Sequence, residues 1–190
     1  MRRMLCVAIA TLFATAAANA GPNLITNGGF ETGSFAPWIS GGNNFFDGVD
    51  TSGFFSHSGV AAGFFGAVGS PSTLSQSFIS PGGGIQISFW LSNLDSFGGP
   101  SSFEALLNGN PLLPASINPG PFDYTKYTFD VVTPAGANNL TFRFRNDPSF
   151  FLLDDVSVTA LPEPASMAIF GGLIAIGSMV ARRRMVKSGA

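Results

Sequence analysis

The stretch IQISFWL, residues 85–91, indicates the fold class of this chain. Apolar residues occupy its odd-numbered positions, and Gln86, Ser88 and Trp90 occupy the even-numbered ones. Because side chains alternate between the two faces of a β-strand, such a pattern places the apolar residues on one face. The stretch therefore predicts a strand that faces a core on one side and presents Trp90 on the other.

Similar alternation recurs along residues 21–160, between clusters of Gly, Pro, Asn and Ser. Further strands are predicted at residues 60–68, 73–79, 102–107, 125–131, 140–145 and 152–159. None of this region shows sustained helical spacing. Many short strands separated by turn residues are typical of an all-β sandwich or barrel. We therefore expect one all-β domain over residues 21–160, which holds 18 of the 20 Phe.

Residues 41–58 have the composition of a loop and contain the pairs Phe45-Phe46 and Phe54-Phe55. One interpretation is a binding loop with exposed aromatic rings. The other is that the rings tuck under the sandwich, which the usual burial of aromatic residues favours. His57 is the only histidine and is predicted to be an exposed spacer in this loop.

Charge is sparse and its signs are segregated. Charged residues make up 11% of the 190 residues, with a formal net charge of −2. Six of the nine basic residues lie near the two ends, whereas ten acidic and three basic residues lie between Gly21 and Leu161, a net charge of −7. This negative middle excludes nucleic acid as a partner, because nucleic-acid binding requires neutralisation of phosphates.

The N-terminal end predicts a secretory signal peptide over residues 1–20. Arg2-Arg3 precedes an apolar run, and Ala18-Asn19-Ala20 has the small-residue pattern of a cleavage site. Cys6, the only cysteine, would leave with this peptide. The mature chain would then have no disulfide, no cysteine nucleophile and no thiolate metal site.

The C-terminal end predicts a single transmembrane helix. Residues 165–181 contain no charge, and a helix of that length spans roughly 25 Å, near the lower limit for crossing a bilayer. Arg182, Arg183 and Arg184 follow at once and predict a cytoplasmic end that stops transfer. The domain of residues 21–160 is then expected on the outer side of the membrane.

Pro162-Glu163-Pro164 comes just before this apolar span. The tripeptide, the span and the Arg cluster at the chain end together resemble the PEP-CTERM sorting signal, over residues 161–190. The resemblance implies an exosortase as partner, with residues 162–164 as its recognition element. It also implies export through the inner membrane of a Gram-negative bacterium, and then release to the cell surface or exterior. The two prolines keep the recognition segment extended and outside the helix.

Three motifs within the domain carry a second resemblance. NLITNGGFETGSFAPW opens it at residues 23–38, HSGVAAGFF follows at residues 57–65, and FLLDDVSVTA closes it at residues 151–160. They resemble carbohydrate-binding modules and galactose-binding-like jelly rolls. This resemblance implies an antiparallel jelly-roll β-sandwich whose first and last strands lie close together.

In those jelly rolls a structural calcium often joins the opening segment to the closing strand. Carried over by resemblance, Glu31, Asp154 and Asp155 are the calcium ligands, since carboxylate oxygens suit this ion. The alternative is that Asp154 or Asp155 caps a loop or pairs with Arg143 or Arg145. Asp154 and Asp155 are adjacent in a predicted strand, so their side chains are expected on opposite faces.

Glycan binding is predicted at Trp90, with Gln86 beside it on the same strand face, because such modules stack sugar rings on aromatic side chains. Burial of Trp90 under a neighbouring strand is the alternative. Catalysis is not expected, because the lone histidine has no triad around it and the acids are mostly single and near turns. The sequence thus predicts an exosortase-sorted structural or adhesive protein of an exopolysaccharide or biofilm layer, or alternatively a carbohydrate-binding module.

Overall fold

The computed structural model describes residues 21–161. The predicted signal peptide, the Pro162-Glu163-Pro164 motif, the apolar span of residues 165–181 and Arg182–Arg184 lie outside the described residues. Within residues 21–161, no helix has the length and hydropathy needed to cross a bilayer.

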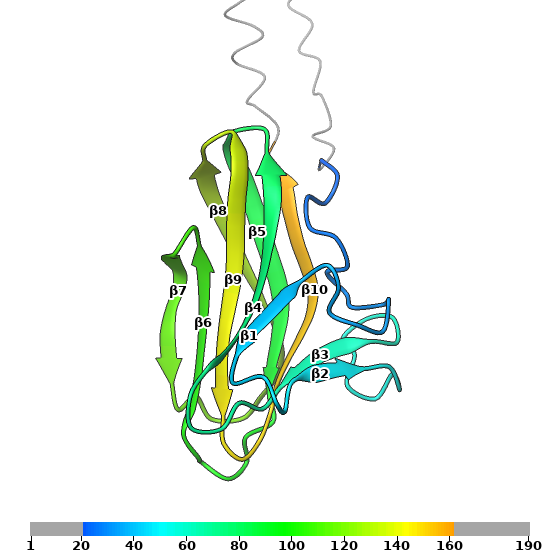
Figure 1. Ribbon diagram of the computed structural model, residues 1–190, viewed down its shortest axis with the longest axis vertical. Coiled ribbons are helices and arrows are strands. Elements are labelled where there is room, and N and C mark those ends of the chain that lie inside the picture. Colours follow the sequence, from blue (N-terminus) through cyan, green and yellow to red (C-terminus); the bar gives the residue numbers. More distant parts are fainter. Residues whose placement is uncertain (1–20, 162–190) are drawn as a thin grey trace, which may run out of the picture. The chain divides into compact units, whose positions relative to one another are not determined.

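Ten strands form two five-stranded antiparallel sheets that pack face to face (Figure 1). Sheet I has the order β1 (Ile39–Gly42), β4 (Ser72–Ser80), β9 (Gly136–Asn146), β6 (Ser101–Leu107) and β7 (Asn110–Ile117). Sheet II has the order β2 (Gly48–Asp50), β3 (Ala62–Phe65), β10 (Phe151–Ala160), β5 (Gly83–Asn93) and β8 (Phe122–Thr133). The described residues thus confirm the prediction of an all-β sandwich.

Most predicted strands lie inside the observed ones, and the observed strands are longer. The 85–91 stretch is the centre of β5, which spans residues 83–93. The predicted strand at 60–68 is shorter in the structure, because β3 covers only Ala62–Phe65. Three strands, β1, β2 and β7, were not predicted: β1 and β2 are very short, and β7 contains two prolines and is mostly exposed.

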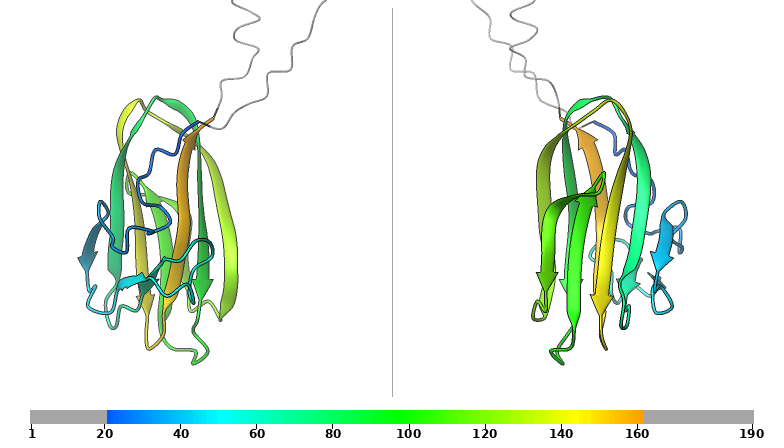
Figure 2. Two further views of the ribbon diagram at one scale, coloured as in Figure 1. Left: turned by 90° about the vertical axis from the view of Figure 1, so that its right-hand side faces the viewer. Right: turned by 60° about the vertical axis from the view of Figure 1, so that its left-hand side comes forward.

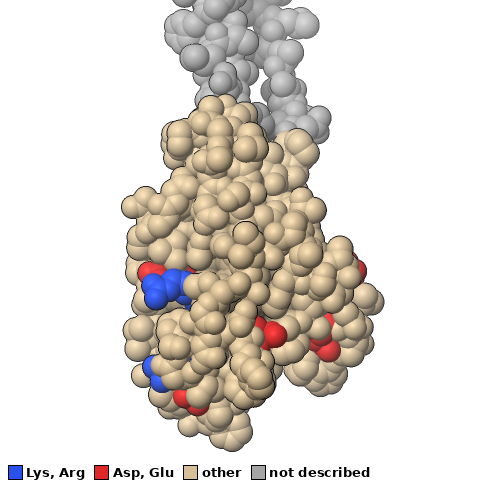
Figure 3. Space-filling model, in the orientation of Figure 1, with Lys and Arg blue, Asp and Glu red and all other residues tan. Residues whose placement is uncertain are grey.

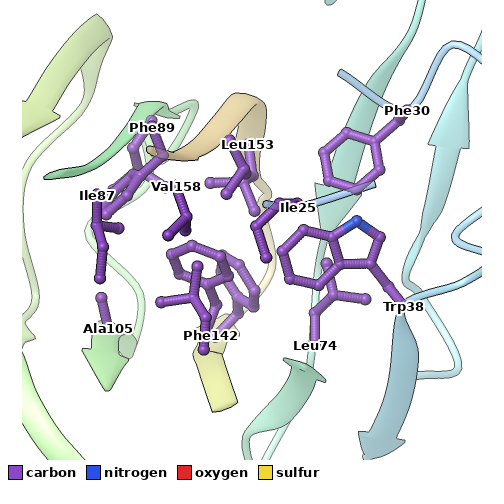
Figure 4. Close-up of a cluster of buried hydrophobic side chains, with 14 of the residues drawn as sticks. Ile25, Phe30, Trp38, Leu74, Ile87, Phe89, Ala105, Phe142, Leu153 and Val158 are labelled. Atoms are coloured by element: carbon purple, nitrogen blue, oxygen red, sulfur yellow. The ribbon is translucent and has the colours of Figure 1, made fainter. Parts of the chain in front are cut away.

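The core lies between the sheets, and phenylalanine is its most frequent residue. Figure 4 shows part of this cluster. The odd-numbered apolar residues of β5 are all buried there, as their alternation predicts. Phe142 and Phe144 face them from β9, and the ring of Phe144 stacks on that of Phe65 with 3.8 Å between centroids. Trp38 is also buried in this cluster, so it packs rather than binds.

The two ends of the domain run side by side (Figure 2). Asn23 forms an antiparallel bridge with Thr159, and the backbone N–H of Leu24 donates to the carbonyl of Val158 at 2.7 Å. The opening segment therefore continues sheet II beside the second half of β10, which is the proximity that the jelly-roll resemblance implies.

Candidate functional site

The outer face of sheet II carries Trp90 and Gln86. Strand register aligns the outward side chains of β8, β5 and β10 in three rows across this face. The rows are Lys126–Trp90–Asp154, Thr128–Ser88–Ser157 and Asp130–Gln86–Thr159. Gln86 Nε2 donates to Asp130 Oδ1 at 2.9 Å, which ties two neighbouring strands together. The face thus combines one large aromatic side chain with a band of hydroxyl and amide groups.

Charged groups are few elsewhere on the domain as well. The side of the molecule drawn in Figure 3 shows only scattered Lys, Arg, Asp and Glu among uncharged residues. A surface of this kind offers hydrogen bonds rather than strong electrostatic attraction to a ligand.

Trp90 is half-buried because a loop residue covers it. The imidazole of His57 stacks on the indole with 3.7 Å between ring centroids and an interplanar angle of 19°. The ring of Tyr124 meets the imidazole edge-on at 5.3 Å, and its hydroxyl donates to the carbonyl of Phe55 at 2.7 Å. Trp90 is therefore neither free in solvent nor under a neighbouring strand, the two arrangements expected from the sequence.

The two adjacent carboxylates of β10 fix His57 in this position. Asp154 Oδ2 accepts hydrogen bonds from the backbone N–H groups of His57 (2.8 Å) and Ser58 (3.2 Å). Asp155 Oδ2 lies 2.7 Å from His57 Nδ1, and Asp155 Oδ1 accepts from the Ser58 hydroxyl at 2.7 Å. His57 is exposed, as predicted, but it is not a mere spacer, because its backbone and ring are both held.

A β-bulge lets both carboxylates reach the same loop. The pairing of β10 with β5 shifts register between Asp154 and Ser157, and Asp155 has a φ of 48°, in the left-handed region. A bulge inserts an extra residue and redirects the following side chain. The expectation that Asp154 and Asp155 point to opposite faces is therefore wrong, since it assumed an unbroken strand.

Glu31 holds the same loop from the opening segment. Its Oε1 accepts from the backbone N–H groups of Val60 (2.9 Å) and Ala61 (3.1 Å). A Cβ built on Gly29 would lie 3.6 Å from Asp154 Oδ1, 3.7 Å from Asp155 Oδ1 and 3.8 Å from Glu31 Cγ. The three acids that the sequence singles out are thus brought around one glycine, and they clamp the loop of residues 51–61.

Burial changes the ionisation of two side chains at this site, Asp154 and Tyr124. Burial raises the pKa of Asp154 to about 6, against the opposing effect of the N–H groups that donate to it. Burial also raises the pKa of the Tyr124 phenol, and the negative charges of Asp154 and Asp155 raise it further. Tyr124 is therefore a neutral hydrogen-bond donor at this site.

Most carboxylate oxygens of the clamp are already engaged in hydrogen bonds. Both oxygens of Asp154, both of Asp155 and one of Glu31 already accept hydrogen bonds, all but one of them from the loop. In the part of the chain that the structure describes, no three Asp, Glu, His or Cys side chains are grouped closely enough to hold a metal ion. The contacts match the alternative from the sequence, in which the acids cap a loop, and they leave few free oxygens for calcium.

Several aromatic rings of the loops are exposed rather than tucked under the sandwich. Phe45 is 83% exposed and Phe54 is 81% exposed, against the burial that the sequence favours. Each packs edge-on against its neighbour in the chain, with 4.9 Å between ring centroids in both pairs. These pairs keep a defined shape on the surface without joining the core.

Sequence reasoning missed His57 and Tyr124 as members of this site. His57 lies 97 positions before Asp154 and 33 before Trp90, and no local pattern links these positions. Tyr124 lies just before the predicted strand of residues 125–131, and the sequence did not show that its hydroxyl reaches the loop. Only the packing of the loop onto β5 and β10 brings them together.

No protein-family model matches the chain, and no curated protein matches it. A solved family 61 carbohydrate-binding module in complex with β-1,4-galactotriose does match, with a TM-score of 0.60 and 22% identity over 74% of this chain and 99% of that one. This is the fold of carbohydrate-binding modules.

Two further solved structures show the same fold. The family 22 xylan-binding domain of Xyn10C from Paenibacillus barcinonensis has a TM-score of 0.55 and 17% identity, over 78% of this chain and 100% of that one. The K1 cleaved adhesin domain of Lys-gingipain from Porphyromonas gingivalis has a TM-score of 0.56 and 18% identity, over 70% and 96%. The jelly-roll sandwich of such modules is therefore the architecture of residues 21–161.

Proposed function

We propose that residues 21–161 form a carbohydrate-binding domain that holds a glycan on the outer face of sheet II. The observation that carries this proposal is the Trp90–His57 stack at one end of a band of hydroxyl and amide side chains. Aromatic rings offer apolar surface to the C–H faces of sugars, while Ser, Thr and Gln can donate to and accept from sugar hydroxyls. The fold shared with carbohydrate-binding modules supports the same reading.

Replacing Trp90 with alanine tests this proposal. Aromatic anchors at binding sites typically contribute 2 kcal/mol or more, so affinity for the bound polysaccharide should fall by about thirtyfold or more. The measurement is affinity electrophoresis or pull-down of the full-length chain on a panel of polysaccharides that includes galactans, xylans and bacterial exopolysaccharides.

Phe54→Ala is the matched control, because Phe54 is an exposed aromatic residue of the same loop and faces solvent. It should bind as the parent does. If the parent retains no polysaccharide in the panel, or if Trp90→Ala binds as tightly as the parent, sheet II is not a glycan site. The domain then fits the structural or adhesive role that needs no ligand on this face.

Calcium at Glu31, Asp154 and Asp155 stays a prediction. A bound ion would join the opening segment to β10, and these carboxylates would first have to release some of the loop's hydrogen bonds. An ion that binds only the folded chain raises its stability by about 2.7 kcal/mol at a hundred times its dissociation constant. Thermal melts should therefore rise by several degrees in calcium relative to chelator, and not in Glu31→Gln. Equal melting temperatures in calcium and in chelator would show that the acids serve only as a loop clamp.

Delivery to the exterior is the second part of the proposal. The order of Pro162-Glu163-Pro164, the apolar span of residues 165–181 and Arg182–Arg184 supports sorting by an exosortase after export by the signal peptide. The mature domain would then act at the cell surface or in an extracellular polysaccharide layer.

Removing residues 162–190 should abolish membrane retention and C-terminal processing. Cell fractionation and mass spectrometry of the C-terminus measure both effects. Glu163→Ala is a gentler variant that keeps the apolar span, and it should slow processing while retaining the chain in the membrane. Unchanged processing and location in the deletion variant would reject the sorting proposal without affecting the glycan site.

A further inference from the structure

β8 is a long edge strand whose outer side has no partner strand in the described part of the chain. Its twelve residues, Phe122–Thr133, pair with β5 on one side only (Figure 1). The strand contains neither Gly nor Pro and alternates in exposure along most of its length. By contrast β7, the corresponding edge of sheet I, contains Pro111 and Pro114 and pairs irregularly. Unpaired N–H and C=O groups along such an edge are a template for another strand.

The charges on β8 select one partner and one register. Lys126 and Asp130 are four residues apart, exposed and on the outward face of sheet II. When a strand pairs antiparallel with its own copy around a twofold axis at Thr128, Lys126 of each copy lies opposite Asp130 of the other. Moving the axis by two residues in either direction places Lys126 opposite Lys126, or Asp130 opposite Asp130. Opposite charges across a strand pair stabilise it and like charges destabilise it.

The remaining residues of β8 fit the same register. An axis at Thr128 sets Tyr127 opposite Phe129 on the inward face and Tyr124 opposite Val132 on the outward face. Val132 is 83% exposed in the single chain, so this pairing would cover it. Aromatic and β-branched pairs across strands are favourable, and a twofold axis gives an interface that closes on itself.

Lys126 is also available for such a contact. Arg143 pairs with Glu104 at 3.0 Å, and Arg145 lies 3.9 Å from Asp147. Among the basic residues that the structure describes, only Lys126 lacks an ion pair. A single exposed Lys on an edge strand ordinarily discourages pairing, but here it has its complement four residues away on the same strand.

We propose that two copies of this chain associate through β8, antiparallel and centred on Thr128, to form one continuous ten-stranded sheet. The backbone hydrogen bonds and aromatic pairs supply the affinity. Exposed ion pairs contribute little energy themselves. The role of the two Lys126–Asp130 pairs is therefore to select the register rather than to supply the affinity. This inference does not depend on glycan binding, although the assembly would place two Trp90 sites on one continuous face.

A cysteine at the axis tests the register directly. Residues 21–161 contain no cysteine, so the full-length chain with Cys6→Ser provides a cysteine-free background. In that background Thr128→Cys should form a disulfide-linked dimer under mild oxidation, because directly opposed residues in antiparallel strands have Cα atoms about 4.5–5.5 Å apart. Asp130→Cys is the control, since its two copies would lie four residues apart along the paired strands, roughly 13 Å, and should remain unlinked.

Exchanging the charges of Lys126 and Asp130 tests whether the partner of β8 is a second copy of the same strand. In detergent at low salt, Lys126→Glu should weaken the dimer of the full-length chain about tenfold in light scattering, because both ion pairs become repulsive contacts. The double variant Lys126→Asp/Asp130→Lys restores opposite charges and should return the dimer to near the parent's affinity. Both sites are exposed, so neither variant disturbs the core.

A monomeric parent in light scattering overturns the proposal. So does equal crosslinking of Thr128→Cys and Asp130→Cys, or a double variant as weak as Lys126→Glu. Each of these three results means that the chains do not pair in this register. Polysaccharide binding by Trp90 is measured separately, so failure here leaves the glycan proposal standing.

Discussion

Phe142→Ala is expected to lower the free energy of unfolding by about 3–5 kcal/mol, the usual cost of removing a large aromatic side chain from a packed core. Phe142 is fully buried on β9, and its ring meets Phe89 edge-on at 5.0 Å and Phe103 at 6.1 Å. Its removal leaves a cavity between the sheets that these rings cannot fill without leaving their rotamers. Urea denaturation of the full-length chain, followed by tryptophan fluorescence, measures the loss.

Phe54→Ala serves as the control for this variant too, because Phe54 is 81% exposed. Its stability should stay within about 0.5 kcal/mol of the parent, as for ordinary surface substitutions. Equal losses in the two variants would mean that the exposed aromatic rings carry as much of the stability as the core does.

Gly28→Ala is expected to destabilise the domain by roughly 2–4 kcal/mol, combining overpacking with a weakened backbone hydrogen bond. A Cβ on Gly28 would lie 1.9 Å from the carbonyl oxygen of Val156, and this contact is with backbone that has no rotamer to change. The N–H of Val156 also donates to the carbonyl of Gly28 at 3.0 Å. The opening segment must therefore move away from β10, and thermal melts should show a large decrease in melting temperature.

Gly120→Ala is the matched comparison, because a Cβ there meets no atom within 4 Å and the residue has no left-handed φ. It should melt within a few degrees of the parent. If Gly28→Ala has the same melting temperature as Gly120→Ala, the opening segment does not need close contact with β10.

The sequence was a good guide wherever alternation was strong. β5 alternates apolar and polar residues over residues 85–89 and β9 does so over residues 140–145, so the faces of these segments followed from the order of residues alone. β7 could not be predicted, because Pro111 and Pro114 argue against a strand and its residues are mostly exposed. Short strands such as β2 have too few residues to show any period.

The site was only partly predictable, and the reason is the bulge in β10. Residues 151–160 have the composition of a regular strand, and no residue among them marks the register shift after Asp154. Once the shift is known, the convergence of Asp154 and Asp155 on Ser58 follows. The cover that His57 places on Trp90 depends on this convergence, so sequence reasoning found the tryptophan but not the loop residue above it.

The bridge between Asn23 and Thr159 holds the first and last residues of the domain next to each other. Because the N- and C-terminal ends of the domain are neighbours, the domain could be inserted at a single site in a host protein without separating the two host residues on either side of it. Domains with adjacent ends are those that tolerate insertion into other proteins and relocation of their termini. The same sandwich could therefore be placed within a larger chain, or be reconnected from Leu161 back to Gly21, without change to either sheet.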